Sequence, residues 1–217
     1  FRNREERTNP GAYLTADCRG NLHRIATEFE ERTGLHLRVG TEPEMMWLKM
    51  NEDGTPAVEG VSKPYCYHID QFSELQPVIH KVIEYGQAMG LDMIQGDHED
   101  APGQIELNFN FDRAEQTADN LSTFRQICKQ VGRELNVFPC FMPKPFMGVS
   151  ANGCHHNISL WRGGKDEIKK LGNDPAKPGE YDYWDHLDWV IDRAISDQRK
   201  LRDTRRPPGA HPAPRLR

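Results

Sequence analysis

The chain contains 217 residues, of which 36% are hydrophobic, and it carries a formal net charge of −5 at pH 7. This length allows one substantial domain with a packed core. No run approaches the roughly 18 consecutive apolar residues that a membrane-spanning helix needs. The segment 202–217 holds five Arg and one Asp, so the rest of the chain is strongly acidic. An acidic body argues against nucleic acid as a partner and favours a small molecule or a metal ion.

The five cysteines are scattered and form no C-x-x-C pair. This pattern argues against a zinc ribbon or a disulfide framework and is typical of a reducing compartment, so we predict a cytoplasmic protein. The first residues, FRNREERTNP, do not resemble a signal peptide. The chain also lacks a starting Met, and we therefore expect that Phe1 is not the natural beginning of the protein.

The first half of the chain shows both helical and strand patterns. In chain order, they predict a helix over 21–33 that ends at Gly34, a strand over 35–49, a loop over 51–63, and a helix that begins at 73–77 and ends at Met89. A strand over 103–111, GQIELNFNF, comes next, because its residues alternate without error. Ile105, Leu107, Phe109 and Phe111 form an apolar face, and the opposite face holds only amides and a carboxylate. We expect a half-buried strand.

The second half adds predicted elements of both kinds: a helix over 113–135, strands over 137–142 and 154–161, and a helix over 183–201. Because the elements lack a steady βαβ alternation, we predict an α+β fold with a largely antiparallel sheet and helices on one face. The segment 202–217 has no period and is expected to be a disordered tail, or the product of a shifted reading frame.

Three predicted strands carry polar pairs at positions i and i+2, on one face of each strand: Glu42 and Glu44, Gln104 and Glu106, and His155 and Asn157. Glu99 lies just upstream of the second pair. If the strands are neighbours, four carboxylates and one imidazole converge, which is costly unless a cation neutralises them. Oxygen ligands with one His suit Mg²⁺ or Mn²⁺, the ions that phosphate chemistry requires. Taken singly, each pair is more often a solvated or structural face.

Three stretches resemble the catalytic domain of glutamine synthetases in order and spacing: GTEPE (40–44), HEDAPGQIE (98–106) and KPFMGVSANGCHHNIS (144–159). The resemblance covers about 34–161 and implies that 1–201 is a partial catalytic domain. It implies that Glu44, Glu99 and Glu106 hold a first divalent cation, and that Glu42 and His155 hold a second one. It implies roles for further residues, in substrate binding for Ser150, Asn152 and Gly153, and in nucleotide binding for Lys144, Asn157 and Ser159. No catalytic residue is assigned.

The resemblance also implies an activity. The family uses ATP and two or more Mg²⁺ or Mn²⁺ ions to phosphorylate the γ-carboxylate of glutamate, and ammonia or another amine then displaces the phosphate. Full-length relatives form homo-oligomeric stacked rings. The stretch NGCHHNISLW resembles the branch that joins glutamate to amines other than ammonia. The chain departs from the family at Ser150-Ala151, where the family has Asn-Gly. On this resemblance, we expect the 217-residue sequence to begin after the family's N-terminal β-domain and to lack the family's later arginines.

Three alternatives remain open at this point. The first is a non-catalytic fragment that binds a metal ion or a nucleotide without turnover. The second is a guanidino-type kinase, which shares the sheet architecture and transfers phosphoryl groups. The third is a purely structural acidic face that has no ligand.

Overall fold

The computed structural model describes residues 16–60, 66–162 and 165–166. The chain forms two compact units, Arg38–Ile158 and the residues on either side of that range. The predicted helix at 183–201 and the predicted tail at 202–217 lie outside the described residues. Within the described part, no helix is long and apolar enough to cross a membrane.

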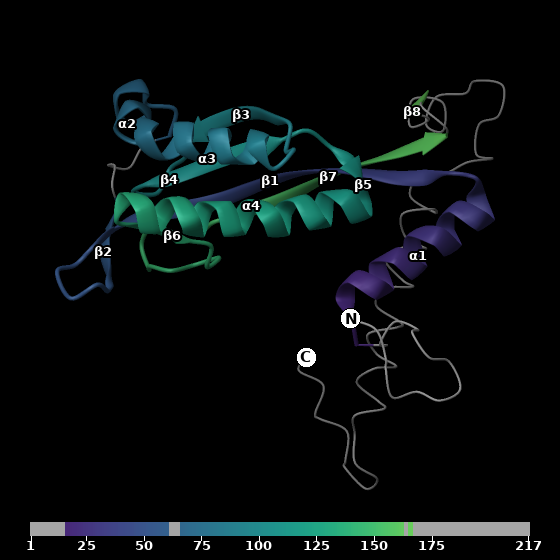
Figure 1. Cartoon of the computed structure of the whole chain (residues 1–217), viewed down its shortest axis with the longest axis horizontal. Coiled ribbons are helices and arrows are strands. Elements are labelled where there is room, and N and C mark those ends of the chain that lie inside the picture. The colour runs from purple at the N-terminus through teal and green to yellow at the C-terminus, as the bar shows by residue number, and fades with distance from the viewer. Residues whose placement is uncertain (1–15, 61–65, 163–164, 167–217) are drawn as a thin grey trace, which may run out of the picture. The chain divides into compact units, whose positions relative to one another are not determined.

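Helices and strands follow one another in a mixed order (Figure 1): α1 (Cys18–Thr33), β1 (His36–Met50), β2 (Pro56–Gly60), α2 (Ile69–Glu74), α3 (Gln76–Ala88), β3 (Met93–His98), β4 (Gln104–Phe109), β5 (Asp112–Arg113), α4 (Ala114–Leu135), β6 (Val137–Cys140), β7 (Cys154–Arg162) and β8 (Lys165–Asp166). The described strands form one sheet in the order β3-β4-β1-β7-β8, and β2, β5 and β6 also pair with β1. The pairs β1–β4, β1–β6 and β3–β4 are antiparallel. The predicted α+β class is therefore confirmed.

Capping residues define the ends of the predicted helices. The Asp17 side chain accepts a hydrogen bond from the Gly20 N–H at 2.9 Å, so α1 begins three residues before the predicted start. Gly34 ends α1 in the left-handed conformation, with φ of 68°, and Asn136 ends α4 in the same way. Helix α3 ends at Ala88, one residue before the predicted end. The helical predictions thus differ from the structure mainly at the first turns.

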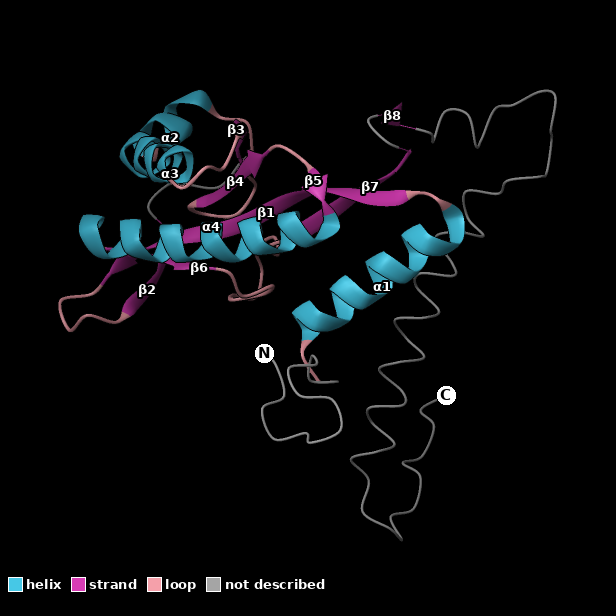
Figure 2. Ribbon diagram, turned by 45° about the vertical axis from the view of Figure 1, so that its right-hand side comes forward, coloured by secondary structure: helices cyan, strands magenta, loops and turns pink. Residues whose placement is uncertain are grey.

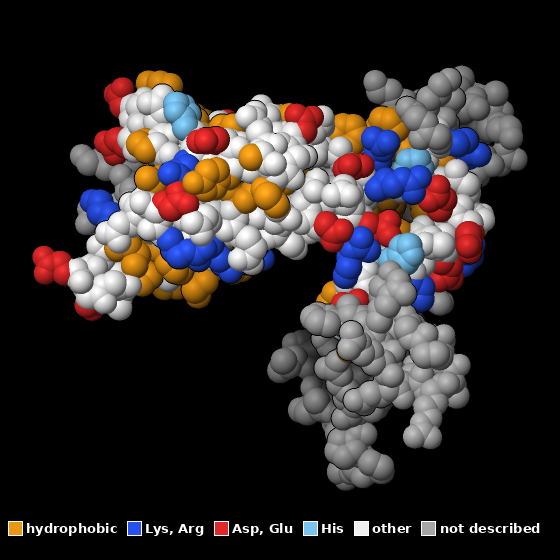
Figure 3. All heavy atoms as spheres, in the orientation of Figure 1, with side chains coloured by type: hydrophobic (Ala, Val, Ile, Leu, Met, Phe, Trp, Pro, Cys, Tyr) orange, Lys and Arg blue, Asp and Glu red, His pale blue; other side chains and the backbone are white. Residues whose placement is uncertain are grey.

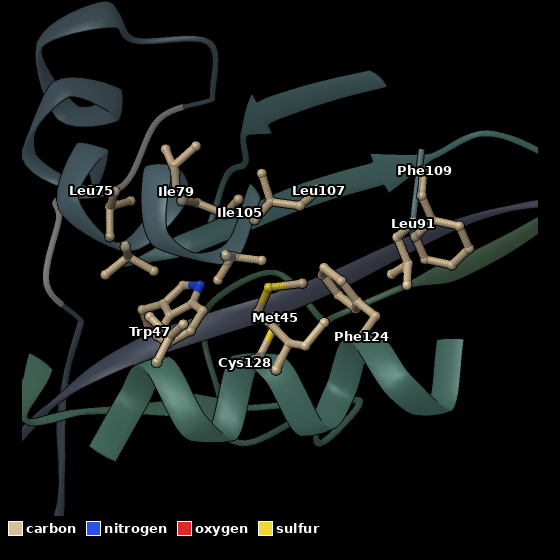
Figure 4. Close-up of a cluster of buried hydrophobic side chains, with 14 residues drawn as sticks. Met45, Trp47, Leu75, Ile79, Leu91, Ile105, Leu107, Phe109, Phe124 and Cys128 are labelled. Atoms are coloured by element: carbon tan, nitrogen blue, oxygen red, sulfur yellow. The ribbon is translucent and has the colours of Figure 1, made fainter. Parts of the chain in front are cut away.

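One face of the sheet packs against α3 and α4 (Figures 2 and 4). Met45 and Trp47 of β1 are fully buried there, between the two helices. The rings of Phe109 and Phe124 join β4 to α4, with their centroids 5.9 Å apart. Burial of each such side chain contributes about 1.5–3 kcal/mol. The buried members of this cluster are Met45, Trp47, Leu75, Val78, Ile79, Val82, Leu91, Ile105, Leu107, Phe109, Phe124, Ile127, Cys128 and Val131.

The opposite face of β1 changes character along the strand. The alternation of β1 places Met46 and Leu48 on the face that also carries Glu42 and Glu44. Met46 and Leu48 form a second buried cluster with Ala101 and Cys140, and Phe146 and Val149 pack against it. Apolar side chains of the segment 141–153 thus cover the part of β1 that comes after Glu42 and Glu44.

Five of the described elements were not predicted from the sequence, and two of them, β5 and β8, are strands of only two residues. Strand β2 lies in the predicted loop 51–63, α2 has only six residues, and β3 has the sequence MIQGDH. A six-residue helix is too short to show a helical period, and MIQGDH has no clean alternation of apolar and polar residues.

A polar cluster joins α3 to α4. Lys81 Nζ lies 2.7 Å from Glu134 Oε2, and the Tyr85 hydroxyl donates to the same carboxylate at 2.9 Å. Gln130 Nε2 donates to Glu134 Oε1 at 2.7 Å. These hydrogen bonds, that of Lys81 above all, lower the pKa of Glu134 to about 2.

We expect Glu134→Gln to lower the melting temperature at pH 7. A carboxylate with a depressed pKa stabilises the fold above its ordinary pKa of 4.5, and this contribution is lost as the pH falls from there toward about 2. The difference in melting temperature between wild type and variant should therefore shrink between pH 5 and pH 2. Thermal unfolding followed by circular dichroism measures it, with exposed Glu84→Gln as the control. A difference that is the same at both pH values would contradict this account.

Candidate functional site

Three carboxylates lie in register on neighbouring strands. Glu44 of β1 pairs with Glu106 of β4, and Glu106 pairs with Asp97 of β3. Directly opposite residues of antiparallel strands project from the same face. We call Glu44, Glu106 and Asp97 the acidic row. The predicted proximity of Glu44 and Glu106 is confirmed, whereas Asp97 was not predicted because its strand was not.

The acidic row and Glu99, which follows β3, lie in an environment that disfavours ionised carboxylates. Burial, and then the charges of Glu44 and Glu106, raise the pKa of Glu99 to about 7. Burial also raises the pKa of Glu106, although its hydrogen bond from Asn108 acts in the opposite direction. The Glu99 carboxylate raises the pKa of the Tyr67 phenol as well. The site therefore concentrates negative potential that a cation would relieve.

The polar face of β4 is buried, so the prediction of a half-buried strand was wrong. Gln104, Glu106 and Asn108 are only 1%, 8% and 7% exposed. Phe111, predicted to lie on the apolar face, follows the end of the strand and is 42% exposed. Buried polar groups require hydrogen-bond partners. This polar face therefore depends on hydrogen bonds within the protein and not on contact with solvent.

Glu44 is held by two donors from different segments. The Gly153 N–H and Gln104 Nε2 donate to Glu44 Oε2 at 2.9 and 3.0 Å. The Glu44 N–H in turn donates to the Gly153 carbonyl at 3.1 Å. A Cβ atom at position 153 would lie 2.8 Å from Glu44 Oε1, so a larger residue here would require the Glu44 carboxylate to shift.

Gln104 connects three parts of the site. Its Oε1 accepts from the Ala101 N–H at 2.9 Å, and its Nε2 lies 2.9 Å from both the Ala151 carbonyl and Asn152 Oδ1. The amide's two hydrogens are thus shared among these acceptors and Glu44. The sequence placed Gln104 on the polar face but gave it no separate role. Its position two residues before Glu106 was the only signal.

The predicted substrate-binding and nucleotide-binding residues of the loop make hydrogen bonds within the chain. Asn152 Nδ2 donates to the Cys140 and Met142 carbonyls at 3.0 and 2.9 Å, so the Asn152 amide positions the loop. The Ser150 hydroxyl donates to Asp100 Oδ2. Lys144 Nζ donates to the Val149 carbonyl. Ligand contacts of these residues stay predictions.

A second group gathers around Glu42. Its Oε2 lies 3.2 Å from His155 Nδ1, and its Oε1 accepts from Asn157 Nδ2 at 2.7 Å. The His155 side chain is 69% exposed. The structure thus brings together Glu42, His155 and Asn157, as the sequence predicted. Ser159 belongs to the other compact unit, where its hydroxyl accepts from the Trp161 indole N–H at 2.8 Å.

The set of possible ligand atoms at this site suits a hard divalent cation. It consists mainly of carboxylate oxygens, and the buried Asn108 Oδ1 has no hydrogen-bond partner. As placed, however, no group of three or more His, Cys, Asp or Glu side chains in the described ranges could hold a metal ion. The carboxylates are electrostatically coupled without converging on one point, so metal binding stays a proposal.

Two pockets flank the helices of this unit. One pocket, of about 250 Å³, lies along β3. It is lined by residues of α2, by residues of the segment just before α2, and by Asp97 of β3. The other, of about 430 Å³, lies between α4 and β6 and includes Lys129, Arg133 and Phe138. Figure 3 shows hydrophobic side chains beside Lys and Arg side chains in the region of α4 and β6. Only the first pocket includes a member of the acidic row.

Comparison with known proteins identifies the family. A family model described as "Glutamine synthetase, catalytic domain" matches residues 15–177. A glutamine synthetase of Staphylococcus aureus (strain MW2) is 32% identical over 153 residues, which are 70% of this chain and 34% of the relative. One of Rhizobium meliloti (strain 1021) is 32% identical over 161 residues, 69% of this chain and 37% of the relative. The chain belongs to the glutamine synthetase family.

Solved structures agree with this assignment. The structure titled "Apo GmaS without ligand" has a TM-score of 0.66 and 29% identity, and the match covers 75% of this chain and 39% of that one. A "GmaS/ADP complex" has the same TM-score and 28% identity, with 78% and 38% covered. The chain spans between about 34% and 37% of the length of the curated relatives.

We expect Glu99 to titrate near pH 7 in the metal-free protein. Because its folded pKa exceeds the ordinary value of 4.5, its ionisation destabilises the fold as the pH rises from 4.5 through 7. Glu99→Gln should therefore be more stable than wild type at pH 8 and similar at pH 4. Carbon-13 NMR of the carboxyl group and thermal unfolding measure both effects. A midpoint near 4.5 would contradict the expectation.

Gln104→Leu should lower the free energy of unfolding by about 1–3 kcal/mol, since it leaves the buried Ala101 N–H and the buried Asn152 Oδ1 without this partner. Gln116→Leu on the exposed side of α4 is the matched control, with an expected change within about 0.5 kcal/mol. Urea unfolding gives both values. Equal effects of the two substitutions would show that the Gln104 contacts contribute nothing.

Proposed function

We propose that the chain is the metal-binding and nucleotide-binding part of an ATP-dependent ligase that joins ammonia or another amine to the γ-carboxylate of glutamate. The observation that carries the proposal is the pairing of Glu44 with Glu106, beside Glu99 and against the loop at Gly153. A structural neighbour described as an ADP complex supports the use of a nucleotide. Membership in the family supports the reaction class.

In the proposed reaction, a γ-carboxylate oxygen of glutamate attacks the γ-phosphorus of ATP, and ADP leaves. The nitrogen of the amine then attacks the acyl carbon of the γ-glutamyl phosphate, phosphate leaves, and the nitrogen loses a proton. Both steps concentrate negative charge on phosphate oxygens. Divalent cations, when bound, offset this charge and hold the phosphate groups in line.

Five residues would hold the divalent cations, Mg²⁺ or Mn²⁺: Glu44, Glu99 and Glu106 the first, and Glu42 and His155 the second. The chain orients several of these ligands through hydrogen bonds. The Gly153 N–H and Gln104 fix Glu44, and Asn108 Nδ2 donates to Glu106 Oε1 at 2.6 Å. Such supporting contacts tune the affinity and geometry of a metal site.

The loop between β6 and β7, together with residues of β7, would bind the organic substrates. We assign the nucleotide to Lys144, Asn157 and Ser159, and glutamate to Ser150, Asn152 and Gly153. The hydrogen bonds of Asn152 to the main chain support a loop of fixed shape. A preformed loop saves the ordering cost of binding. We further propose a cytoplasmic enzyme whose full-length form assembles with copies of itself in stacked rings.

A second candidate is a fragment that binds a metal ion and a nucleotide without turnover. Two observations favour it for this polypeptide. The chain spans only about a third of its curated relatives, and the described side chains do not already form a coordination site. This candidate predicts saturable binding of Mn²⁺ and ATP and no release of ADP.

Release of ADP by the purified chain tests the proposal. The assay contains ATP with Mg²⁺ or Mn²⁺, glutamate, and ammonia, methylamine, ethanolamine or a polyamine. We expect release that requires glutamate and an amine, and we expect Gly153→Ala to lower it by about tenfold to a hundredfold because it displaces Glu44. The exposed variant Glu52→Gln is the control. Binding of ATP and Mn²⁺ without any release would contradict the ligase and establish the second candidate.

A further inference from the structure

We propose that the pocket between α4 and β6 is a binding site for an organic carboxylate that has an apolar body, of the arylalkyl carboxylate class. Its described lining residues belong to the end of β1, to α4, to β6 and to the turn between the last two. They include no member of the acidic row and no residue of the loop 141–153. The inference therefore goes beyond the proposed function and does not depend on it.

The pocket has the size and the apolar surface of a ligand site. Its volume is about 430 Å³, which lies within the roughly 300–1,000 Å³ of pockets that hold small organic molecules. Met50, Val137 and Phe138 supply hydrocarbon surface. Phe138 is 40% exposed, so part of its ring is open to a ligand. An apolar group that leaves water against this wall gains free energy in proportion to the area that it buries.

Close packing between α4 and β6 fixes the walls of the pocket. Gly132 is buried, and a Cβ atom there would lie 2.6 Å from the Val137 carbonyl oxygen and 2.7 Å from Pro139 Cδ. Glycine thus lets the helix approach the strand closely. Asn136 ends α4 in the left-handed conformation and turns the chain directly into β6. Because backbone contacts hold both walls, a ligand does not have to order them on binding.

Two cations of α4 line the same pocket, in the region where Figure 3 shows Lys and Arg side chains beside hydrophobic ones. Lys129 and Arg133 lie at positions i and i+4, so their side chains are neighbours on the helix surface. No Asp or Glu is among the described residues that line the pocket. The whole sequence carries a formal net charge of −5, so the local charge is opposite in sign to that of the molecule. An anion is the complementary ligand.

Other parts of the described structure do not neutralise these two cations. Lys129 has no hydrogen-bond or ion-pair partner among the described residues. Arg133 donates to the neutral Gln130 Oε1 at 2.6 Å, which leaves its charge uncompensated. Glu134, the next residue along the chain, has its carboxylate 2.7 Å from Lys81 Nζ of α3. The pocket therefore offers positive charge that no neighbouring carboxylate uses.

The dipole of α4 accounts for only part of this charge. Cations are favourable in the last turn of a helix, which is where Arg133 lies. Lys129 lies one turn earlier, and its neighbours at i−4 and i+4 are Arg125 and Arg133. Like charges at this spacing destabilise a helix. A bound carboxylate would offset the repulsion between them.

A carboxylate with an apolar body complements both kinds of wall at once. Its charged group would lie beside Lys129 and Arg133, and a guanidinium can donate two parallel N–H bonds to a carboxylate. Its body would lie against Phe138 and Val137. Small anions such as acetate lack this body, and glutamate carries an ammonium group and a second carboxylate in its place. The expected ligand therefore differs from the substrates of the proposed ligase.

Ligand-observed NMR with the 217-residue chain tests the proposal. The probes are hydrocinnamate, its neutral amide, phenylpropylammonium, acetate and glutamate. We expect hydrocinnamate to bind about tenfold more tightly than its amide and about tenfold more tightly than acetate. Phenylpropylammonium should bind more weakly than the amide, and excess glutamate should not displace hydrocinnamate. Equal affinity for hydrocinnamate and its amide would overturn the proposal.

Substitutions in the walls separate the charge from the apolar surface. Lys129→Gln and Arg133→Gln should each weaken hydrocinnamate binding by about tenfold. Arg125→Gln, which removes a cation of the same helix from outside the pocket, is the matched control and should change it by less than about twofold. Phe138→Ala should weaken hydrocinnamate and leave acetate unchanged. All four side chains are exposed, so the variants should fold. Equal effects of the three charge substitutions would overturn the proposal.

Sedimentation velocity distinguishes a small ligand from a second copy of the chain as the occupant of the pocket. If the pocket binds a small carboxylate, Lys129→Gln and Phe138→Ala should leave the oligomeric state unchanged. Dissociation of an oligomer by either substitution, together with no binding of hydrocinnamate to wild type, would show that another copy covers the pocket. That result would overturn the proposal.

Discussion

Two carboxylates face each other on neighbouring strands of this sheet, and the contacts around them have to accommodate their like charges. Glu44 and Glu106 lie directly opposite each other, and Glu106 is buried. Such an arrangement destabilises a fold unless hydrogen bonds and a counter-charge offset it. The chain supplies hydrogen bonds from Gln104, Asn108 and the Gly153 main chain. A bound cation, which we propose, would supply the counter-charge, and this connects the fold to its proposed chemistry.

The elements around these carboxylates hold them in place. Strand β1 runs through the middle of the sheet and carries carboxylates and then Met46 and Leu48 on one face. The loop 141–153 covers the apolar half and reaches the carboxylates through Gly153. On the other face, α3 and α4 pack against Met45 and Trp47 and hold the strands in register (Figure 4). Ligands on rigid strands with supporting contacts are placed more accurately than ligands on loops.

Much of the candidate site could be predicted from the sequence because its proposed ligands, except Glu99, lie on strands with a clear period. The alternation in GQIELNFNF identified Glu106, and the pairs at Glu42 and His155 were found in the same way. The register of Glu44 with Glu106 could not be predicted, because it depends on which strands become neighbours. Asp97 was missed because MIQGDH lacks an alternation. The burial of Gln104 and the hydrogen bonds of Asn152 depend on contacts between residues far apart in the sequence. No local sequence pattern predicts such contacts.

Electron paramagnetic resonance of Mn²⁺ would show whether these carboxylates hold a divalent cation, since free and bound Mn²⁺ give distinguishable signals. The measurement compares the wild-type chain with Glu106→Gln, which keeps the shape of the side chain and removes its charge, and with Glu52→Gln as the control. We predict saturable binding in wild type and control, and a dissociation constant that is at least about tenfold higher in Glu106→Gln. Equal affinity in all three proteins, or no saturable binding in any, would contradict it.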